Sequence, residues 1–256
     1  MVVDATPDGI GGGNKPTYER AGVKAVFQGG EDHSLTNFSF VAQCNFEKAA
    51  GRKMVRVVSC NTTALCRTLH ALNSGLGVLK ARVVLVRRAA DPDETSKGPI
   101  DAIVPDPVTV PSHHGADVQS VIEGLNITTM ALKVPETHMH LHSVIVSLKG
   151  EPTRDRVLDA LVKEPRVLLV DAKAGFKSTA SIIDMAREMN RPRNDVYEAV
   201  VWRDSVSVVD GEAYFFLAVH QEAIVTPENI DAIRAVSGGL GKDQSMKATD
   251  ASLGIA

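Results

Sequence analysis

The apolar segments of this chain change in length and pattern near residue 58, and this change restricts the fold more than any other feature. Up to that point, short valine- and phenylalanine-rich runs at 1–5, 23–27, 38–41 and 55–58 alternate with helical stretches. Such alternation is typical of a parallel α/β sheet that is buried on both faces. Longer segments of alternating polarity follow, and they favour an α+β region with a mostly antiparallel sheet that carries helices on one side.

The expected elements can be placed by their ends. Asn14 is a plausible helix cap, with Pro16 in the first turn, and Asp210-Gly211 predicts a hairpin. Gly9-Ile-Gly-Gly-Gly13 is interpreted as a permissive turn. The expected helices are 14–21, 59–72, 153–162, 178–189 and a final helix that opens at Thr226-Pro227 and runs through Val236. The later strands are expected at 81–87, 108–110, 127–134, 138–148, 198–209 and 214–220.

Charge and cysteine content exclude some classes of protein. The 256 residues carry a formal net charge of −3, which argues against a dedicated nucleic-acid binder with a basic face. No apolar run approaches the ~20 residues of a membrane span, and no signal peptide is visible at the N-terminus. Three cysteines form an odd, small set, so we expect free thiols in a reducing cytoplasm.

Cys60 is the first candidate for chemistry, because it opens the helix predicted from Ser59. Unpaired N–H groups and the positive end of the helix dipole favour a thiolate there, and they can also hold a developing oxyanion. The alternative is a buried structural cysteine, a common fate of this residue type. Cys66 lies about 240° around the same helix and is expected to be structural.

Histidines supply the second candidates. His113 and His114 follow Pro111-Ser112 and are expected in a loop, whereas His138, His140 and His142 alternate and should share one face of a strand. Three such histidines can bind a metal, but no acidic or cysteine partner lies nearby in the sequence, so no metal site is predicted. The alternative is one functional histidine among solvated or hydrogen-bonded neighbours.

Arg87 and Arg88 end a predicted strand, where adjacent arginines can bind a phosphate, although a solvated edge is the commoner role. A cysteine at a helix start, histidines and arginines together suggest acyl chemistry on an anionic substrate. A dinucleotide fingerprint requires glycines at the first, third and sixth positions, but the sixth position counted from Gly9 is Asn14. The glycine-rich run therefore does not match the fingerprint.

Six motifs stand in order along the chain: Asp4-Ala-Thr-Pro-Asp-Gly-Ile-Gly11, Phe27-Gln-Gly-Gly-Glu31, Val58-Ser-Cys-Asn-Thr-Thr-Ala-Leu65, Arg87-Arg-Ala-Ala-Asp-Pro92, Pro111-Ser-His-His-Gly115 and Ala218-Val-His-Gln-Glu222. Together they resemble archaeal-type glyceraldehyde-3-phosphate dehydrogenase over essentially the whole chain. The resemblance implies an incomplete Rossmann-like parallel sheet followed by the family's catalytic domain. It also implies NAD or NADP as cofactor, glyceraldehyde 3-phosphate and inorganic phosphate as substrates, and a cytoplasmic homotetramer.

The resemblance also implies a role for each matching residue. Cys60 would be the nucleophile that forms a thiohemiacetal and then a thioester. His140 would be the base and thiolate partner, with His142 as the reserve choice because the spacing cannot separate them. The implied substrate contacts are Ser59, Asn61, His113 and His114, and the implied cofactor contacts are Gly30, Arg88 and Gln221.

The family pattern includes an N-terminal strand, a glycine-rich turn and a first βαβ unit that have no counterpart in these 256 residues. We therefore expect residues 1–58 to be the C-terminal portion of a dinucleotide-binding domain, 59–222 the catalytic domain, and 223–256 a helix that returns to the nucleotide-binding domain. The missing pyrophosphate cradle leaves a second hypothesis, a catalytically silent module that retains oligomerisation. A third is a thiol hydrolase that uses Cys60 and His140 without a nucleotide.

Overall fold

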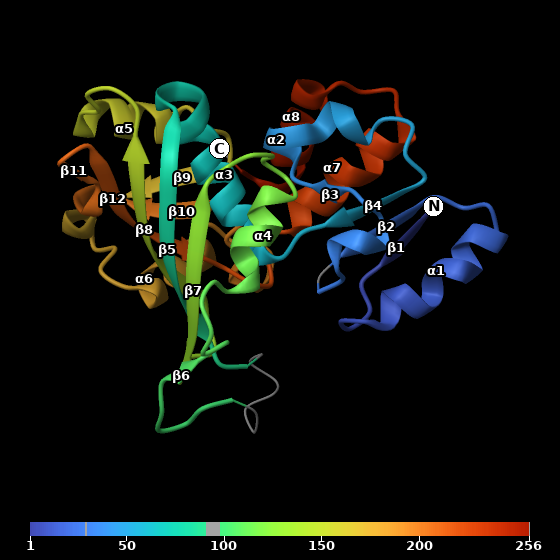
Figure 1. Cartoon of the computed structure of the whole chain (residues 1–256), viewed down its shortest axis with the longest axis horizontal. Helices are drawn as coiled ribbons and strands as arrows, with labels where there is room; N and C mark the ends of the chain where they lie inside the picture. The colour runs from blue at the N-terminus through green and yellow to red at the C-terminus, as the bar shows by residue number, and fades with distance from the viewer. Residues whose placement is uncertain (29, 91–97, 256) are drawn as a thin grey trace.

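The computed structural model describes residues 1–28, 30–90 and 98–255. Its strands form two sheets, a small one near the N-terminus and a large one whose strands lie between residues 78 and 219 (Figure 1). Helices α2, α7 and α8 gather around the small sheet, whereas α3 and α5 lie beside the large one (Figure 1). The α/β and α+β regions predicted from the sequence are both present.

The small sheet is parallel throughout and has the order β1-β2-β4-β3. Its central strands are almost entirely buried, as expected for a parallel sheet with covered faces. The strands are β1 (Val2–Asp4), β2 (Ala25–Gln28), β3 (Ser39–Phe40) and β4 (Met54–Val57). Between them lie α1 (Ile10–Arg20), α2 (Ala42–Asn45) and the 3-10 helices η1 (His33–Leu35) and η2 (Phe46–Ala49).

The turn predicted at Gly9 to Gly13 was wrong, because α1 begins at Ile10 and places Pro16 in its interior. Gly9 precedes the helix with a φ of 81°, a left-handed conformation that glycine adopts without strain. The Glu31 carboxylate accepts the N–H of Gly11 at 2.8 Å, and a Cβ on Gly11 would meet the same oxygen at 2.8 Å. A contact twenty residues away in the sequence therefore supports the early helix start.

The large sheet has eight strands, with the order β6-β7-β5-β8-β12-β10-β9 and β11 paired to β12. Most pairs are antiparallel, but β5 pairs with β7 and β9 with β10 in parallel. The predicted hairpin is confirmed, since Val209 faces Glu212 across Asp210-Gly211. The strands are β5 (Val78–Arg88), β6 (Val104–Pro105), β7 (Ile127–Val134), β8 (His140–Leu148), β9 (Val167–Val170), β10 (Ala199–Trp202), β11 (Ser207–Val209) and β12 (Glu212–Val219).

Two predicted strands differ from the structure. Residues 108–110 form no strand, because Pro107 and Pro111 flank them without N–H donors, and Val108 is 80% exposed. The segment 198–209 is divided into β10 and β11 by the 3-10 helix η5 (Arg203–Ser205).

Helices cover both faces of the large sheet, which corrects the prediction of helices on one side. Val201 of β10 packs in the same core as Leu65 and Leu69 of α3, whereas its neighbour Val200 packs with Ile182 of α6. Successive strand residues point to opposite faces, so α3 and α6 lie on opposite sides. The helices are α3 (Cys60–Leu76), α4 (His113–Gln119), α5 (Arg154–Val162) and α6 (Thr179–Glu188), with 3-10 helices η3 (Ala172–Ala174) and η4 (Pro192–Asn194).

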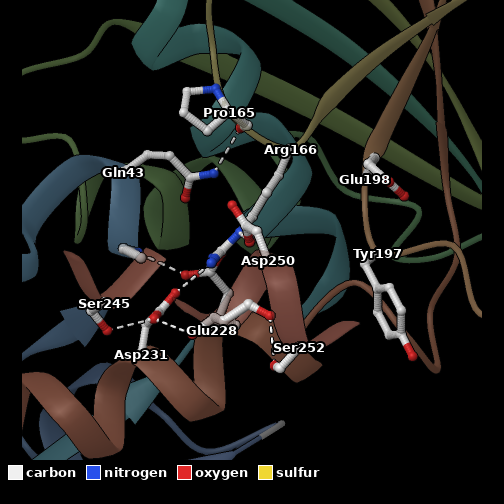
Figure 2. A network of polar contacts seen from close by, with 12 residues as sticks. Gln43, Pro165, Arg166, Tyr197, Glu198, Glu228, Asp231, Ser245, Asp250 and Ser252 are labelled. Carbon is white, nitrogen blue, oxygen red and sulfur yellow. Dashed lines mark hydrogen bonds and ion pairs between the residues drawn. The ribbon is translucent and has the colours of Figure 1, made fainter. Parts of the chain in front are cut away.

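The chain ends with two helices, α7 (Thr226–Ser237) and α8 (Lys242–Leu253), where the sequence predicted one. α7 packs against β2 and β4 of the small sheet. Two fully buried arginines join these helices to the rest of the molecule, with Arg166 at the centre of Figure 2. Arg67 Nη2 bonds Glu228 at 2.7 Å, and Arg166 bonds Asp231 at 2.6 Å and Asp250 at 2.7 Å. The network connects α3 and the start of β9 to α7 and α8.

Candidate active site

A cavity of about 600 Å³ opens where the loops after β1 and β2 meet the first turn of α3 and the end of β5. Ligands bind at the carboxyl ends of parallel strands in open α/β sheets, which is the edge of the small sheet that borders this cavity. All the predicted site residues except His140 line it. The lining residues are Thr6, Pro7, Asp8, Gln28, Gly30, Ser59, Cys60, Asn61, Arg87, Arg88, His113, His114, Gln221, Glu222 and Val225.

Cys60 is the first residue of α3 and follows the cap residue Ser59, whose Oγ accepts the N–H of Thr62. The Cys60 side chain is buried, and its Sγ lies 3.5 Å from Nε2 of His140. Burial raises the pKa of the thiol to about 11, although nearby Arg87 and the N–H of Asn61 act to lower it. Burial therefore acts against the thiolate that the helix N-terminus favours, and the reactivity of Cys60 stays a prediction.

His140 is the first residue of β8. It contacts Cys60 and is 1% exposed. Burial, with the charges of His142 and Arg87, holds the pKa of His140 well below its usual value, so the ring is neutral. Its Nδ1 accepts the backbone N–H of Arg88 at 3.0 Å. A neutral ring that accepts at Nδ1 carries its proton on Nε2, and that proton faces Cys60.

His142 occupies a separate position on the same face of β8. It is fully buried, and its Nε2 lies 2.8 Å from Oδ1 of Asn61. Burial and the charge of Arg87 lower the pKa of His142 to about 3. The geometry thus pairs His140 with the thiol and His142 with the neighbouring amide, a distinction that the sequence spacing could not make.

The remaining histidines depart from the predicted arrangement. His113 and His114 begin α4 instead of lying in a loop, and their rings stack with centroids 4.0 Å apart. His114 is buried against Ser112, and burial together with His113 lowers its pKa to about 2. His138 is exposed and lies outside β8, because Met139 adopts a left-handed φ of 61° that interrupts the strand. In the ranges that the structure describes, no three His, Cys, Asp or Glu side chains converge on a metal position.

The two arginines at the end of β5 differ in their partners. Arg87 is about a quarter exposed and bonds Asp106 at 2.9 Å. Arg88 is buried, and its side chain bonds Gln221 at 2.8 Å and Glu222 at 2.7 Å. Arg88 therefore holds two cavity-lining residues in place instead of forming a solvated edge.

Comparisons with known proteins identify the family of this site. Residues 59–205 match the family described as glyceraldehyde 3-phosphate dehydrogenase, C-terminal domain. The glyceraldehyde-3-phosphate dehydrogenase 1 of Methanosarcina barkeri is 58% identical over 92% of this chain and 69% of its own length. The chain belongs to the glyceraldehyde-3-phosphate dehydrogenase family. The glyceraldehyde-3-phosphate dehydrogenases of Methanopyrus kandleri and Pyrococcus abyssi are each 54% identical over the whole chain. The matched segments span 73% and 75% of those two proteins.

Family membership agrees with the resemblance, but the structure adds cavity residues that the sequence reasoning missed. Glu222 lies between Arg88 and His220, whose Nε2 is 3.2 Å from it. Burial raises the pKa of Glu222, but His220 and Arg88 outweigh burial and hold that pKa below its usual value. The sequence could have indicated Glu222 as a site residue, since it follows the predicted cofactor contact Gln221 just beyond the end of β12.

Asp8 is a second cavity-lining residue that the sequence reasoning missed. A Cβ on Gly30 would lie 2.8 Å from Cβ of Asp8, so the two loops that border the cavity approach closely only because residue 30 is glycine.

In the described chain, no helix is long and apolar enough to cross a membrane.

Proposed function

We propose that this chain carries the chemistry of a phosphorylating glyceraldehyde-3-phosphate dehydrogenase, which converts glyceraldehyde 3-phosphate and inorganic phosphate into 1,3-bisphosphoglycerate. One observation carries the proposal: Cys60 Sγ lies 3.5 Å from Nε2 of His140 beside a cavity that also presents Arg87. A nucleophile, a proton-bearing partner and a cationic wall suit an anionic aldehyde.

Cys60 supplies the covalent chemistry. Its thiol loses a proton to water, and the thiolate attacks the aldehyde carbon. As the C–S bond forms, the carbonyl π bond breaks and leaves negative charge on the former carbonyl oxygen. Removal of hydride from the adduct carbon gives a thioester. Phosphate then attacks the thioester carbon, the C–S bond breaks, and the acyl group leaves as the acyl phosphate.

His140 acts beside the sulfur and the developing charge. Because its Nδ1 accepts the N–H of Arg88, its Nε2–H can donate to the thiolate and to the adduct oxygen. The base role implied by the family resemblance stays a prediction, and the tautomer favours donation.

Substrate binding involves the cavity wall around Cys60. Ser59, His113 and His114 are proposed substrate contacts, with the guanidinium of Arg87 nearby to attract phosphate. His114 is neutral, so it contributes hydrogen bonding and shape instead of charge.

The residues present fit the nicotinamide end of a dinucleotide. The cavity adjoins the carboxyl ends of β1 and β2, and Gly30 lets the Asp8 loop close against it. When bound, NAD or NADP accepts the hydride. Gly30 and Gln221 are proposed as direct contacts, and Arg88 holds Gln221 in position. Gly30→Ala displaces Asp8 and should weaken nucleotide binding in a calorimetric titration, whereas Gly13→Ala in α1 meets no atom within 4 Å and should not.

The same proposal extends to organisation and assembly. Residues 1–58 would contribute to nucleotide binding, 59–222 would form the catalytic domain, and 223–256 would return to the nucleotide-binding part, in a cytoplasmic homotetramer. The face of the large sheet on which α6 packs supports self-association, because Met130, Val84, Ser143 and Phe216 lie in one row across β7, β5, β8 and β12. Met130 and Phe216 are about half exposed.

The test measures NAD and NADP reduction with glyceraldehyde 3-phosphate and phosphate, and compares wild type with Cys60→Ser. We expect the variant to lose activity. Full activity of Cys60→Ser would refute the assignment. Micromolar binding of NAD or NADP would argue against a silent module and identify the preferred nucleotide.

A further inference from the structure

The hydrogen bond between His142 and Asn61 gives His142 a role distinct from that of His140. His142 is fully buried, and its Nδ1 has no partner in the described part of the chain. If Nε2 accepted from Asn61, the ring proton would sit on Nδ1 as an unpaired buried donor, which proteins rarely tolerate. The ring therefore carries its proton on Nε2 and donates to Oδ1 of Asn61 at 2.8 Å.

This bond determines which way the Asn61 amide points. With Oδ1 bound to His142, the amide NH2 group is the part of the side chain that is left to donate. Asn61 lines the cavity beside Cys60, and within residues 1–28, 30–90 and 98–255 no acceptor is bonded to its Nδ2. An oriented amide donor next to the nucleophile is the usual component of an oxyanion site.

We propose that His142 is a positioning residue that holds the Asn61 amide with its NH2 group toward the cavity, where that group donates to the oxyanion of the adduct on Cys60. The inference rests on the proposed function, because it requires Cys60 to form the adduct. It assigns His142 no proton transfer. Asn61 and His140 would then donate to the same oxygen, one from α3 and the other from β8.

The test compares two reactions of Cys60 that need no nucleotide. Acylation by p-nitrophenyl acetate forms an S–C bond, passes through an oxyanion and breaks the ester C–O bond, so p-nitrophenolate leaves and the thiol proton goes to water. Alkylation by iodoacetamide forms an S–C bond with loss of iodide and generates no oxyanion. A residue that serves the oxyanion affects the first reaction only.

We expect Asn61→Ala to slow acylation about 10²-fold and His142→Phe to slow it about tenfold, with alkylation unchanged within about twofold. His142→Gln restores a donor and should recover most of the acylation rate. His138→Phe is the matched control, because His138 is exposed outside the strand and should leave both rates unchanged. His142→Leu provides a second apolar variant if His142→Phe does not fold.

The double variant decides whether His142 acts through Asn61. In the Asn61→Ala background, His142→Phe should cause no further loss of acylation. Equal losses in both backgrounds, or parallel losses of acylation and alkylation, would overturn the inference. If Cys60→Ser still shows the p-nitrophenolate burst, the proposed function fails instead, whatever the His142 variants do.

Discussion

The backbone N–H of Arg88 donates to Nδ1 of His140 at 3.0 Å, while Nε2 of the same ring lies 3.5 Å from Sγ of Cys60. The last residue of β5 thereby determines which nitrogen of the histidine presents a proton to the nucleophile. Neither residue reveals this in the sequence, since the donor is a main-chain amide. The bond requires β5 and β8 to be neighbours, as the antiparallel register provides.

His140→Gln should therefore be far less harmful than His140→Ala. Glutamine retains an N–H near the position of Nε2 but cannot accept a proton as a base. We expect acylation of Cys60 by p-nitrophenyl acetate to fall less than about tenfold in the Gln variant and about 10²- to 10³-fold in the Ala variant. Equal rates for the two variants would instead support a proton-accepting ring.

The alkylation of Cys60 should depend steeply on pH, because burial raises the pKa of its thiol to about 11. The thiolate is the reactive form, so the rate with iodoacetamide should rise about tenfold per pH unit from pH 7 to pH 10. Mass spectrometry of the Cys60 peptide measures the rate. Arg87→Met should lower it at pH 8, because the lost positive charge raises the pKa further. A plateau by pH 8 would contradict the buried neutral thiol.

Arg166→Met should destabilise the protein severely. The guanidinium is fully buried and bonds Asp231 and Asp250, so its removal leaves uncompensated carboxylates in the interior. Breaking a buried ion pair costs about 3–5 kcal/mol in the free energy of unfolding. Urea titration should detect this loss. The exposed pair of Lys48 and Glu123 supplies the control, since Lys48→Met should cost less than about 1 kcal/mol.

Glu228 of this network should also make the fold acid-sensitive. Burial raises the pKa of Glu228, but Arg67 and Arg166 outweigh burial and hold that pKa below its ordinary value of 4.5. As pH falls, the unfolded chain therefore binds the proton first. The stabilisation is complete above about pH 5 and should be lost as the pH falls through 4.5 toward the lower folded pKa. Glu228→Gln should flatten this dependence in urea titrations between pH 6 and pH 3, and an unchanged slope would argue against it.

Phe216→Lys should reduce self-association. Phe216 is 48% exposed on the face of the large sheet on which α6 packs, in the row that contains Ser143, Val84 and Met130. A buried unpaired charge at a subunit contact is costly, so analytical ultracentrifugation should show a smaller species. Val162→Lys on α5 is the control, because Val162 is 55% exposed but lies on a helix that packs on the opposite face. A tetramer that tolerates Phe216→Lys would place the interface elsewhere.

Local sequence patterns predicted many elements because the signals are themselves local. Ser59 caps α3 as expected, and Asp210-Gly211 forms the hairpin turn, since both act within a few residues. The start of α1 was wrong because Glu31 supports it from a distant segment. The run 108–110 resembles a strand in composition, but its flanking prolines prevent ladder bonds.

The candidate site was also predicted from the sequence only in part. Motif order placed Cys60, Asn61, Arg88 and Gln221 together, and the structure brings them to one cavity. Glu222 was missed although it is adjacent to Gln221 in the sequence, because its importance depends on Arg88 and His220 from other segments.

The sequence by itself determined the family, the alternation that yields two kinds of sheet, and the residue types that gather around Cys60. Only the tertiary structure decided how the two central histidines differ. His140 and His142 share a face of β8, yet His140 contacts the thiol and His142 contacts Asn61, because Cys60 and Asn61 are consecutive residues in the first turn of α3. Burial also raises the pKa of Cys60 and lowers those of both histidines, since desolvation disfavours every charged form.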